Sequence, residues 1–103
     1  MKYLVKSRAR LDLKAHWRYI APDDPSAADR LLDAAEDTFK LIAANPEIGS
    51  QRNFRKLVGI RSRAVTGFGK YLVFYQIRAE TVVIVRVLHG MRDLPRFFFK
   101  PRV

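Results

Sequence analysis

Two apolar runs that follow each other almost directly, residues 71–78 and 81–88, constrain the fold of this chain more than any other feature. Both runs are rich in Val, Ile, Tyr and Phe, which favour β-strands, and both are apolar on each face. The segment Arg78-Ala79-Glu80-Thr81 between them is long enough only for a tight turn. The pattern predicts an antiparallel hairpin of two central strands that are covered on both faces.

The second run ends in polar residues that a sheet core does not need: Arg86, His89, Arg92 and Asp93. Arg86 stands between Val85 and Val87, and an arginine in such a strand is costly unless it meets a carboxylate or an interface. His89 is open to three interpretations: a hydrogen bond at the strand end, contact with a partner, or acid–base catalysis, since histidine titrates near pH ~6.5. We therefore expect a functional site at this end of the hairpin.

The N-terminal part of the chain alternates and then takes up helical spacing. Residues 2–6 predict a short strand, and residues 8–21 predict a helix capped by Ser7. We expect Trp17 in the core and His16 in solvent. The predicted buried stripe is Leu13, Trp17 and Ile20, with Leu11, Ala15 and Tyr19 beside it.

A second helix follows a short link. Asp24 is a good N-cap and Pro25 suits the first helical position, where its missing N–H costs nothing. Asn45 can close the helix in a left-handed conformation, and Pro46 cannot continue it. The predicted buried stripe is Ala28, Leu32, Ala35, Phe39 and Ile42.

Residues 46–57 are predicted to form a loop, and residues 60–66 a strand. Arg61 and Arg63 share one face of that strand, which makes them the better candidates for binding an anion. The predicted fold class is α+β: an N-terminal strand, a helical hairpin and a three-stranded antiparallel sheet, followed by a basic tail. One domain, residues 1–103, accounts for the whole length.

Charge divides the chain unevenly. Residues 1–49 hold eight Lys or Arg and eight Asp or Glu, whereas residues 50–103 hold twelve basic and two acidic residues and carry the whole net charge of +10. This excess predicts an anionic partner, either a nucleic acid or an acidic protein. The alternative is a basic face kept for solubility.

The tail carries three consecutive phenylalanines, Phe97, Phe98 and Phe99. Neighbouring side chains diverge in any regular structure, so the three cannot all face one core. Either some of them pack on a partner, or the tail folds back and buries two of them on the sheet.

Several classes of function are disfavoured by composition. With no Cys and with two His far apart in sequence, we expect no metal site, and nothing predicts a cofactor. No apolar run approaches the roughly 20 residues that cross a bilayer, and the N-terminal residues lack the apolar run of a secretion signal. We therefore expect a cytoplasmic protein without membrane contact.

A resemblance to a known family runs through nearly the whole chain. It rests on Asp12, Trp17-Arg18-Tyr19-Ile20, Pro25-Ser26-Ala27-Ala28, Asn45-Pro46-Glu47-Ile48-Gly49, Gly59-Ile60-Arg61-Ser62, Tyr71-Leu72-Val73-Phe74-Tyr75 and Arg86-Val87-Leu88-His89-Gly90-Met91-Arg92-Asp93. In this order and spacing, the motifs resemble the ParE-type toxins of the RelE/ParE superfamily, which belong to bacterial toxin–antitoxin pairs. One departure is Ser50, where many relatives have Arg directly after the Gly.

The resemblance implies a toxin that a cognate antitoxin, ParD-like or of another type, holds inactive in a hetero-oligomer, with plasmid stabilisation as a role. ParE-type toxins are known for blocking DNA gyrase, which requires protein binding and no catalytic residue. An acidic, disordered antitoxin segment would be drawn to residues 50–103. The residues expected to contact a partner are Arg61, Arg63, Arg86, His89, Arg92, Phe97 and Phe98.

Two alternatives stay open. The RelE branch of the superfamily cuts mRNA on the ribosome, and for that reaction the sequence offers His89 as acid or base and Arg61, Arg63 and Arg86 as phosphate donors. Asp93 is a possible base, although at this spacing it is more typical of a turn. A non-toxic, basic nucleic-acid-binding module is the other alternative, although the sequence lacks the signatures of common RNA modules.

Overall fold

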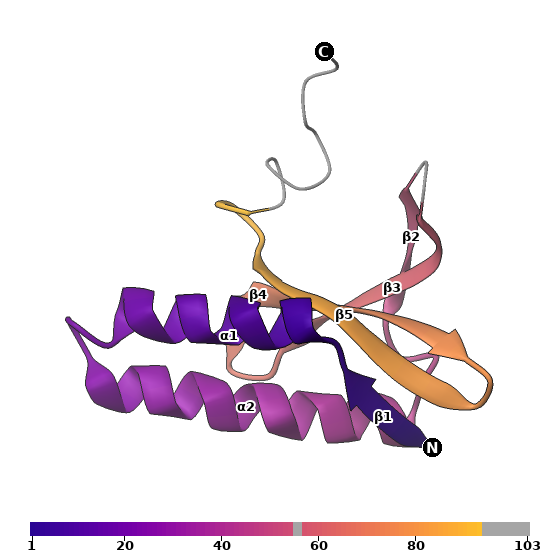
Figure 1. Ribbon diagram of the computed structural model, residues 1–103, viewed down its shortest axis with the longest axis horizontal. Coiled ribbons are helices and arrows are strands. Elements are labelled where there is room, and N and C mark those ends of the chain that lie inside the picture. The colour runs from indigo at the N-terminus through magenta and orange to yellow at the C-terminus, as the bar shows by residue number, and fades with distance from the viewer. Residues whose placement is uncertain (55–56, 94–103) are drawn as a thin grey trace, which may run out of the picture.

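The computed structural model describes residues 1–54 and 57–93 and shows one mixed sheet with two helices packed against it (Figure 1). In chain order the elements are β1 (Lys2–Val5), α1 (Ser7–Ile20), α2 (Pro25–Ala44), β2 (Ser50–Phe54), β3 (Leu57–Val65), β4 (Phe68–Arg78) and β5 (Thr81–His89). The strand order is β1-β5-β4-β3-β2. The α+β class is confirmed, but the sheet has five strands, not three.

The two additional strands lie at the edges of the sheet. β1 pairs in parallel with β5, so the predicted N-terminal strand is part of the same sheet. β2 pairs antiparallel with β3 and lies where the sequence predicted a loop. Its sequence, Ser-Gln-Arg-Asn-Phe, lacks the apolar alternation of a half-buried strand, since an edge strand can be held by backbone pairing on one side.

The predicted hairpin of β4 and β5 is confirmed. Arg78 pairs with Thr81, and the two turn residues Ala79 and Glu80 have φ of 45° and 62°. Two successive left-handed residues match the right-handed twist of the strands on either side, as in a type I′ turn. The hairpin therefore supplies the central scaffold from which the other strands extend.

The face of α1 that meets the core differs from the predicted one. Trp17 is 37% exposed and its indole N–H donates to Asp29 Oδ1 at 2.9 Å, whereas His16 is only 4% exposed. Both predictions were wrong, because the helix turns the face with small Ala9 toward the sheet, which brings His16 inward. Tyr19 lies in solvent, and Ser7 is the first helical residue, with Lys6 as N-cap and no side-chain cap.

The predicted start of α2 is confirmed, since Asp24 Oδ1 accepts from the Ala27 N–H at 3.0 Å and Pro25 follows the cap. The buried stripe was predicted with one error: Leu31 is fully buried, whereas Leu32 is 36% exposed. Asn45 is the C-cap, but its φ of −139° is not left-handed.

The sheet packs apolar side chains on both faces. The larger core joins both helices to the sheet and includes Leu31, Phe39 and Tyr75, while a smaller cluster of Ile60, Phe74 and Leu88 lies apart from it. In the described part of the chain, neither helix combines the length and the apolar character needed to span a membrane. The phenylalanines of the tail lie outside the described residues.

Candidate functional site

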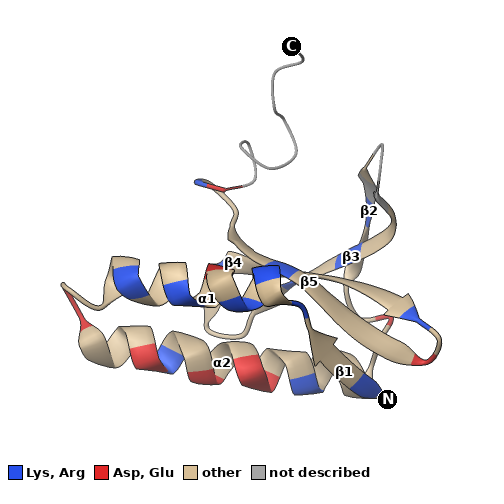
Figure 2. Ribbon diagram, viewed as in Figure 1, with Lys and Arg blue, Asp and Glu red and all other residues tan. Residues whose placement is uncertain are grey.

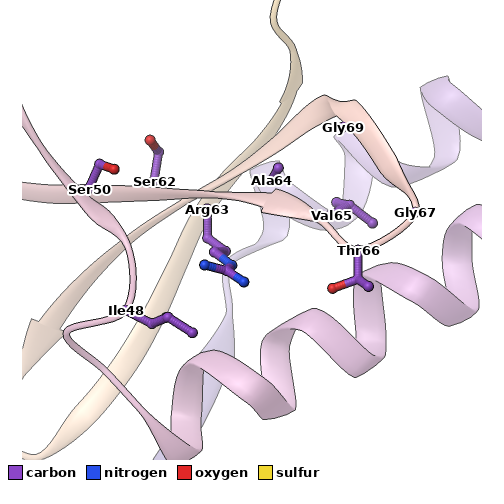
Figure 3. A pocket seen from close by; sticks show the side chains of 9 residues that line it. All are labelled: Ile48, Ser50, Ser62, Arg63, Ala64, Val65, Thr66, Gly67 and Gly69. Carbon is purple, nitrogen blue, oxygen red and sulfur yellow. The ribbon is translucent and has the colours of Figure 1, made fainter.

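A cleft of about 420 Å³ opens where the end of β3 meets the loop that leaves α2 (Figure 3). It lies at the edge of the larger core, and the turn between β3 and β4 closes one side. Its lining residues are Ile48, Ser50, Ser62, Arg63, Ala64, Val65, Thr66, Gly67 and Gly69.

The loop that forms one wall of the cleft is clamped from the sheet. The buried Tyr75 hydroxyl accepts from the Gly49 N–H at 2.8 Å and donates to the Pro46 carbonyl at 2.7 Å. Arg61 Nη1 donates to the carbonyls of Glu47, at 3.2 Å, and Gly49, at 2.8 Å. Arg61 therefore has a structural task as well as its predicted binding role.

The Tyr75 hydroxyl is itself tuned by this arrangement. Burial raises the pKa of Tyr75 above its ordinary value, while the Gly49 N–H and the nearby charges of Arg61 and Arg63 act in the opposite direction. A protonated hydroxyl is what the clamp requires, because only that form donates to the Pro46 carbonyl.

Arg63 differs from Arg61 in its contacts. Its side chain extends from β3 into the space between Ile48 and Thr66, beside α2 (Figure 3). It has no hydrogen bond or ion pair with any other residue in the described ranges 1–54 and 57–93, although it is only partly exposed. Its guanidinium is thus available to a ligand that enters the cleft.

Arg86 has the carboxylate that its apolar strand requires. Its Nε and Nη2 donate to Asp12 Oδ2 and Oδ1 at 2.8 and 2.9 Å, a two-pronged contact with α1. Asp12 Oδ2 also accepts from the Val87 N–H at 3.0 Å. The sequence predicted the need for a partner, and the structure identifies Asp12.

His89 is bound into the turn that follows β5. The Nδ1 atom of its ring accepts from the backbone N–H groups of Met91 and Arg92, each at 3.2 Å. The backbone N–H of His89 donates to Asp93 Oδ2 at 2.7 Å. Burial, followed by the charge of Arg92, lowers the pKa of His89 below 6.5. These contacts give both His89 and Asp93 a role in turn structure.

Arg92 links this turn to α1. Its guanidinium lies 4.1 Å from the ring centre of Tyr19, and its Nη2 is 3.4 Å from His16 Nδ1. His16 Nε2 in turn donates to the Val87 carbonyl at 2.7 Å. Sequence reasoning missed His16. Ala9, Leu13 and His16 stand at i, i+4 and i+7, a spacing that places them on one face of the helix.

The predicted site residues thus fall into two groups. Arg61 and Arg63 lie on β3, while Arg86, His89 and Arg92 lie on or after β5. Arg63 pairs with Val73 of β4, and Val73 pairs with Val87 of β5, so a whole strand separates the groups by about 10 Å. Phe97 and Phe98 lie outside the described residues, within which no three His, Asp or Glu side chains come together as metal ligands.

Charge is arranged by element as well as by sequence position. Most of the charged residues of α2 are acidic, whereas Lys and Arg dominate α1 (Figure 2). Of the nine described residues that line the cleft, Arg63 alone is charged. Within the described part of the chain, the cleft is therefore a positive site without a carboxylate of its own.

Such a fold, a helical hairpin on a mixed five-stranded sheet with an arginine-lined cleft, is that of a small α+β domain. The chain matches the family model "ParE toxin of type II toxin-antitoxin system, parDE" over residues 3–94. It is also similar to Toxin RelE3 of Caulobacter vibrioides, with 32% identity over 85 residues, which covers 82% of this chain and 88% of that protein. The chain therefore belongs to the ParE family of type II toxin–antitoxin toxins, within the RelE/ParE superfamily.

A solved structure supports the same fold. A chain described as "Chromosomal ParDE TA system from P. aeruginosa" matches with a TM-score of 0.61 and 17% identity, covering 86% of this chain and 95% of that one. At this identity the match shows a shared fold.

Proposed function

We propose that this chain is the toxin of a type II pair, that a cognate antitoxin neutralises it, and that it inhibits DNA gyrase by binding. One observation carries the choice of binding over catalysis. Within the described residues, most of the side chains that a nuclease would use are already hydrogen-bonded within the fold.

Cleavage of RNA needs a base, an acid and cationic donors around one phosphate. Arg86 is held by Asp12, and the His89 Nδ1 lone pair holds the turn. Arg63, with its open guanidinium, lies across β4 from both. A nuclease mechanism would need these groups to exchange structural contacts for substrate contacts, whereas a binding protein needs no such exchange.

The antitoxin proposal follows from family and charge together. The related solved structure is described as a ParDE system, and this chain carries a net charge of +10. An acidic antitoxin segment that folds on the toxin would neutralise that charge and bury apolar surface. We place the resulting hetero-oligomer in the bacterial cytoplasm, with plasmid stabilisation as a role.

Ribosome-dependent mRNA cleavage is the second candidate. It is favoured by the relative named Toxin RelE3 and by the open guanidinium of Arg63. A plain nucleic-acid-binding module would predict instead an affinity for bulk RNA or DNA that falls steeply with salt, without toxicity.

The test is a supercoiling assay with purified chain, gyrase, ATP and relaxed plasmid, read after detergent and protease. We expect lost supercoiling and linear DNA, both reversed by the antitoxin encoded beside the toxin. The His89→Ala variant should retain most of this inhibition if it folds, because binding to gyrase requires no acid–base catalysis by His89. Unaffected gyrase together with cleavage of ribosome-bound mRNA, lost in His89→Ala, would replace the proposal with the nuclease.

A further inference from the structure

We propose that the Arg63 cleft is the place where the antitoxin inserts a carboxylate side chain. This inference rests on the proposed toxin–antitoxin pairing and names the chemistry of one contact within it. Three features of the cleft carry it: an unmatched cation, walls that are fixed in advance, and a lining that suits one anion.

The unmatched cation is the first feature. The other partly buried arginines of the described sheet have partners inside the fold: Arg61 donates to the loop carbonyls, Arg52 Nε donates to Ser62 Oγ at 2.7 Å, and Arg86 is held by Asp12. Arg63 is partly buried, yet no described residue accepts a hydrogen bond from its guanidinium group. A guanidinium presents a planar set of donors that matches a carboxylate in a two-pronged contact.

The second feature is that the walls need no rearrangement. Tyr75 and Arg61 hold the loop from Pro46 to Gly49 through four hydrogen bonds to its backbone. On the opposite side, the Thr66 N–H donates to Thr38 Oγ1 at 3.2 Å and so ties the β3–β4 turn to α2. A preformed site does not lose binding free energy to loop ordering.

The third feature distinguishes a protein carboxylate from a nucleic acid. Phosphodiester backbones are bound by several cations in a row, since each phosphate carries a charge. Here one guanidinium shares the cleft with the apolar side chains of Ile48 and Val65, and none of the other described lining residues is charged. One Asp or Glu, flanked by an apolar residue on the same segment, matches both the charge and the walls.

The experiment measures antitoxin binding by calorimetry, with the purified protein encoded beside this chain as the probe. Arg63→Ala should weaken binding by about 30-fold or more, as for a partly desolvated charge pair that loses one member. Arg63→Lys should recover part of the loss, because an ammonium keeps the charge but not the two-pronged geometry. The matched control is Arg78→Ala, which removes the same charge from the exposed end of β4 and should change binding by less than about threefold.

The partner carboxylate is then found from the other side. Each Asp or Glu of the antitoxin is changed to its amide, and one such change should cost as much as Arg63→Ala with the wild-type toxin and almost nothing with Arg63→Ala. Equal affinities for Arg63→Ala and Arg78→Ala, or no coupled carboxylate, would overturn the inference. So would an Arg63-dependent affinity for a single-stranded RNA oligonucleotide with unchanged antitoxin binding.

These outcomes are separate from those of the proposed function. A wild-type chain that binds no antitoxin would remove the toxin–antitoxin proposal itself and this inference with it. A wild-type chain that binds the antitoxin and inhibits gyrase, while Arg63→Ala binds equally well, would remove only the role of the cleft.

Discussion

Arg63 on β3 and Arg86 on β5 are both partly buried arginines of one sheet, yet they have opposite surroundings. Arg86 makes a two-pronged contact with Asp12 and lies at the junction of α1 with the sheet. Arg63 extends into a cleft in which the other described lining residues are uncharged. The same residue type therefore stabilises the fold on β5 and is left for a ligand on β3.

The difference teaches how to separate binding residues from structural ones in a basic protein of this kind. A partly buried charge whose hydrogen bonds are made inside the fold is needed for stability, so its removal lowers the stability of the free protein. A charge without internal partners adds little to stability, so its removal lowers the affinity for a partner instead. Mutations that compare Arg86 on β5 with Arg63 on β3 can test this separation.

The largest expected effect is at Arg86. Arg86→Met leaves the carboxylate of Asp12 partly buried, with the Val87 N–H as its remaining hydrogen-bond donor among the described residues. This change should lower the free energy of unfolding by about 3 kcal/mol. Arg63→Met, the matched change on β3, should alter it by less than about 0.5 kcal/mol. Urea unfolding followed by circular dichroism measures both, and equal losses would erase the contrast between the two arginines.

The next effect concerns the wall of the cleft. A Cβ at Gly49 would lie 2.5 Å from the Tyr75 hydroxyl oxygen, so Gly49→Ala must displace the clamp. We expect a loss of about 2 kcal/mol, as for other overpacked sites. Gly69→Ala is the control, because a Cβ there meets nothing within 4 Å and its expected change is below about 0.5 kcal/mol. The same urea series decides, and a neutral Gly49→Ala would show that the loop is not held tightly.

The sequence predicted the scaffold well because the scaffold depends on local patterns. The β4–β5 hairpin follows from two apolar runs with a short link, and the start of α2 from Asp24 and Pro25. β2 was missed since its polar residues carry no apolar alternation, and β1 was not placed in the sheet because parallel pairing with β5 leaves no local signal.

The site was predictable only in part, for the same reason. Arg86 was expected to need a carboxylate, yet nothing near it in sequence points to Asp12, which is 74 residues away. Arg61 and Arg63 share a strand face and appeared equivalent until Arg61 was found bound to the loop carbonyls. Tertiary contacts, which pair residues far apart in the chain, decide which charges remain open.

The smallest expected effect is a pH dependence at the C-terminal end of β5. The pKa of His89 is lowered in the folded state by burial and by Arg92, while in the unfolded chain it is near ~6.5. Above pH ~6.5 neither state is protonated, so His89 adds no pH dependence there. As the pH falls below ~6.5, the unfolded chain takes up the proton first and stability declines, until the pH passes the folded-state pKa.

Geometry gives this decline a structural cause. Protonation of His89 Nδ1 removes the acceptor of the Met91 and Arg92 N–H groups and adds a positive charge near Arg92, His16 and Lys70, offset in part by Asp93. His89→Gln removes the titrating group, so its free energy of unfolding should fall less than that of the wild type between pH 7 and pH 5, in urea unfolding at each pH. Arg63→Met should keep the wild-type slope, since none of the described lining residues of the cleft is a histidine. An unchanged slope in His89→Gln would show that His89 does not cause the acid sensitivity, and β3 and β5 would then no longer differ in their response to pH.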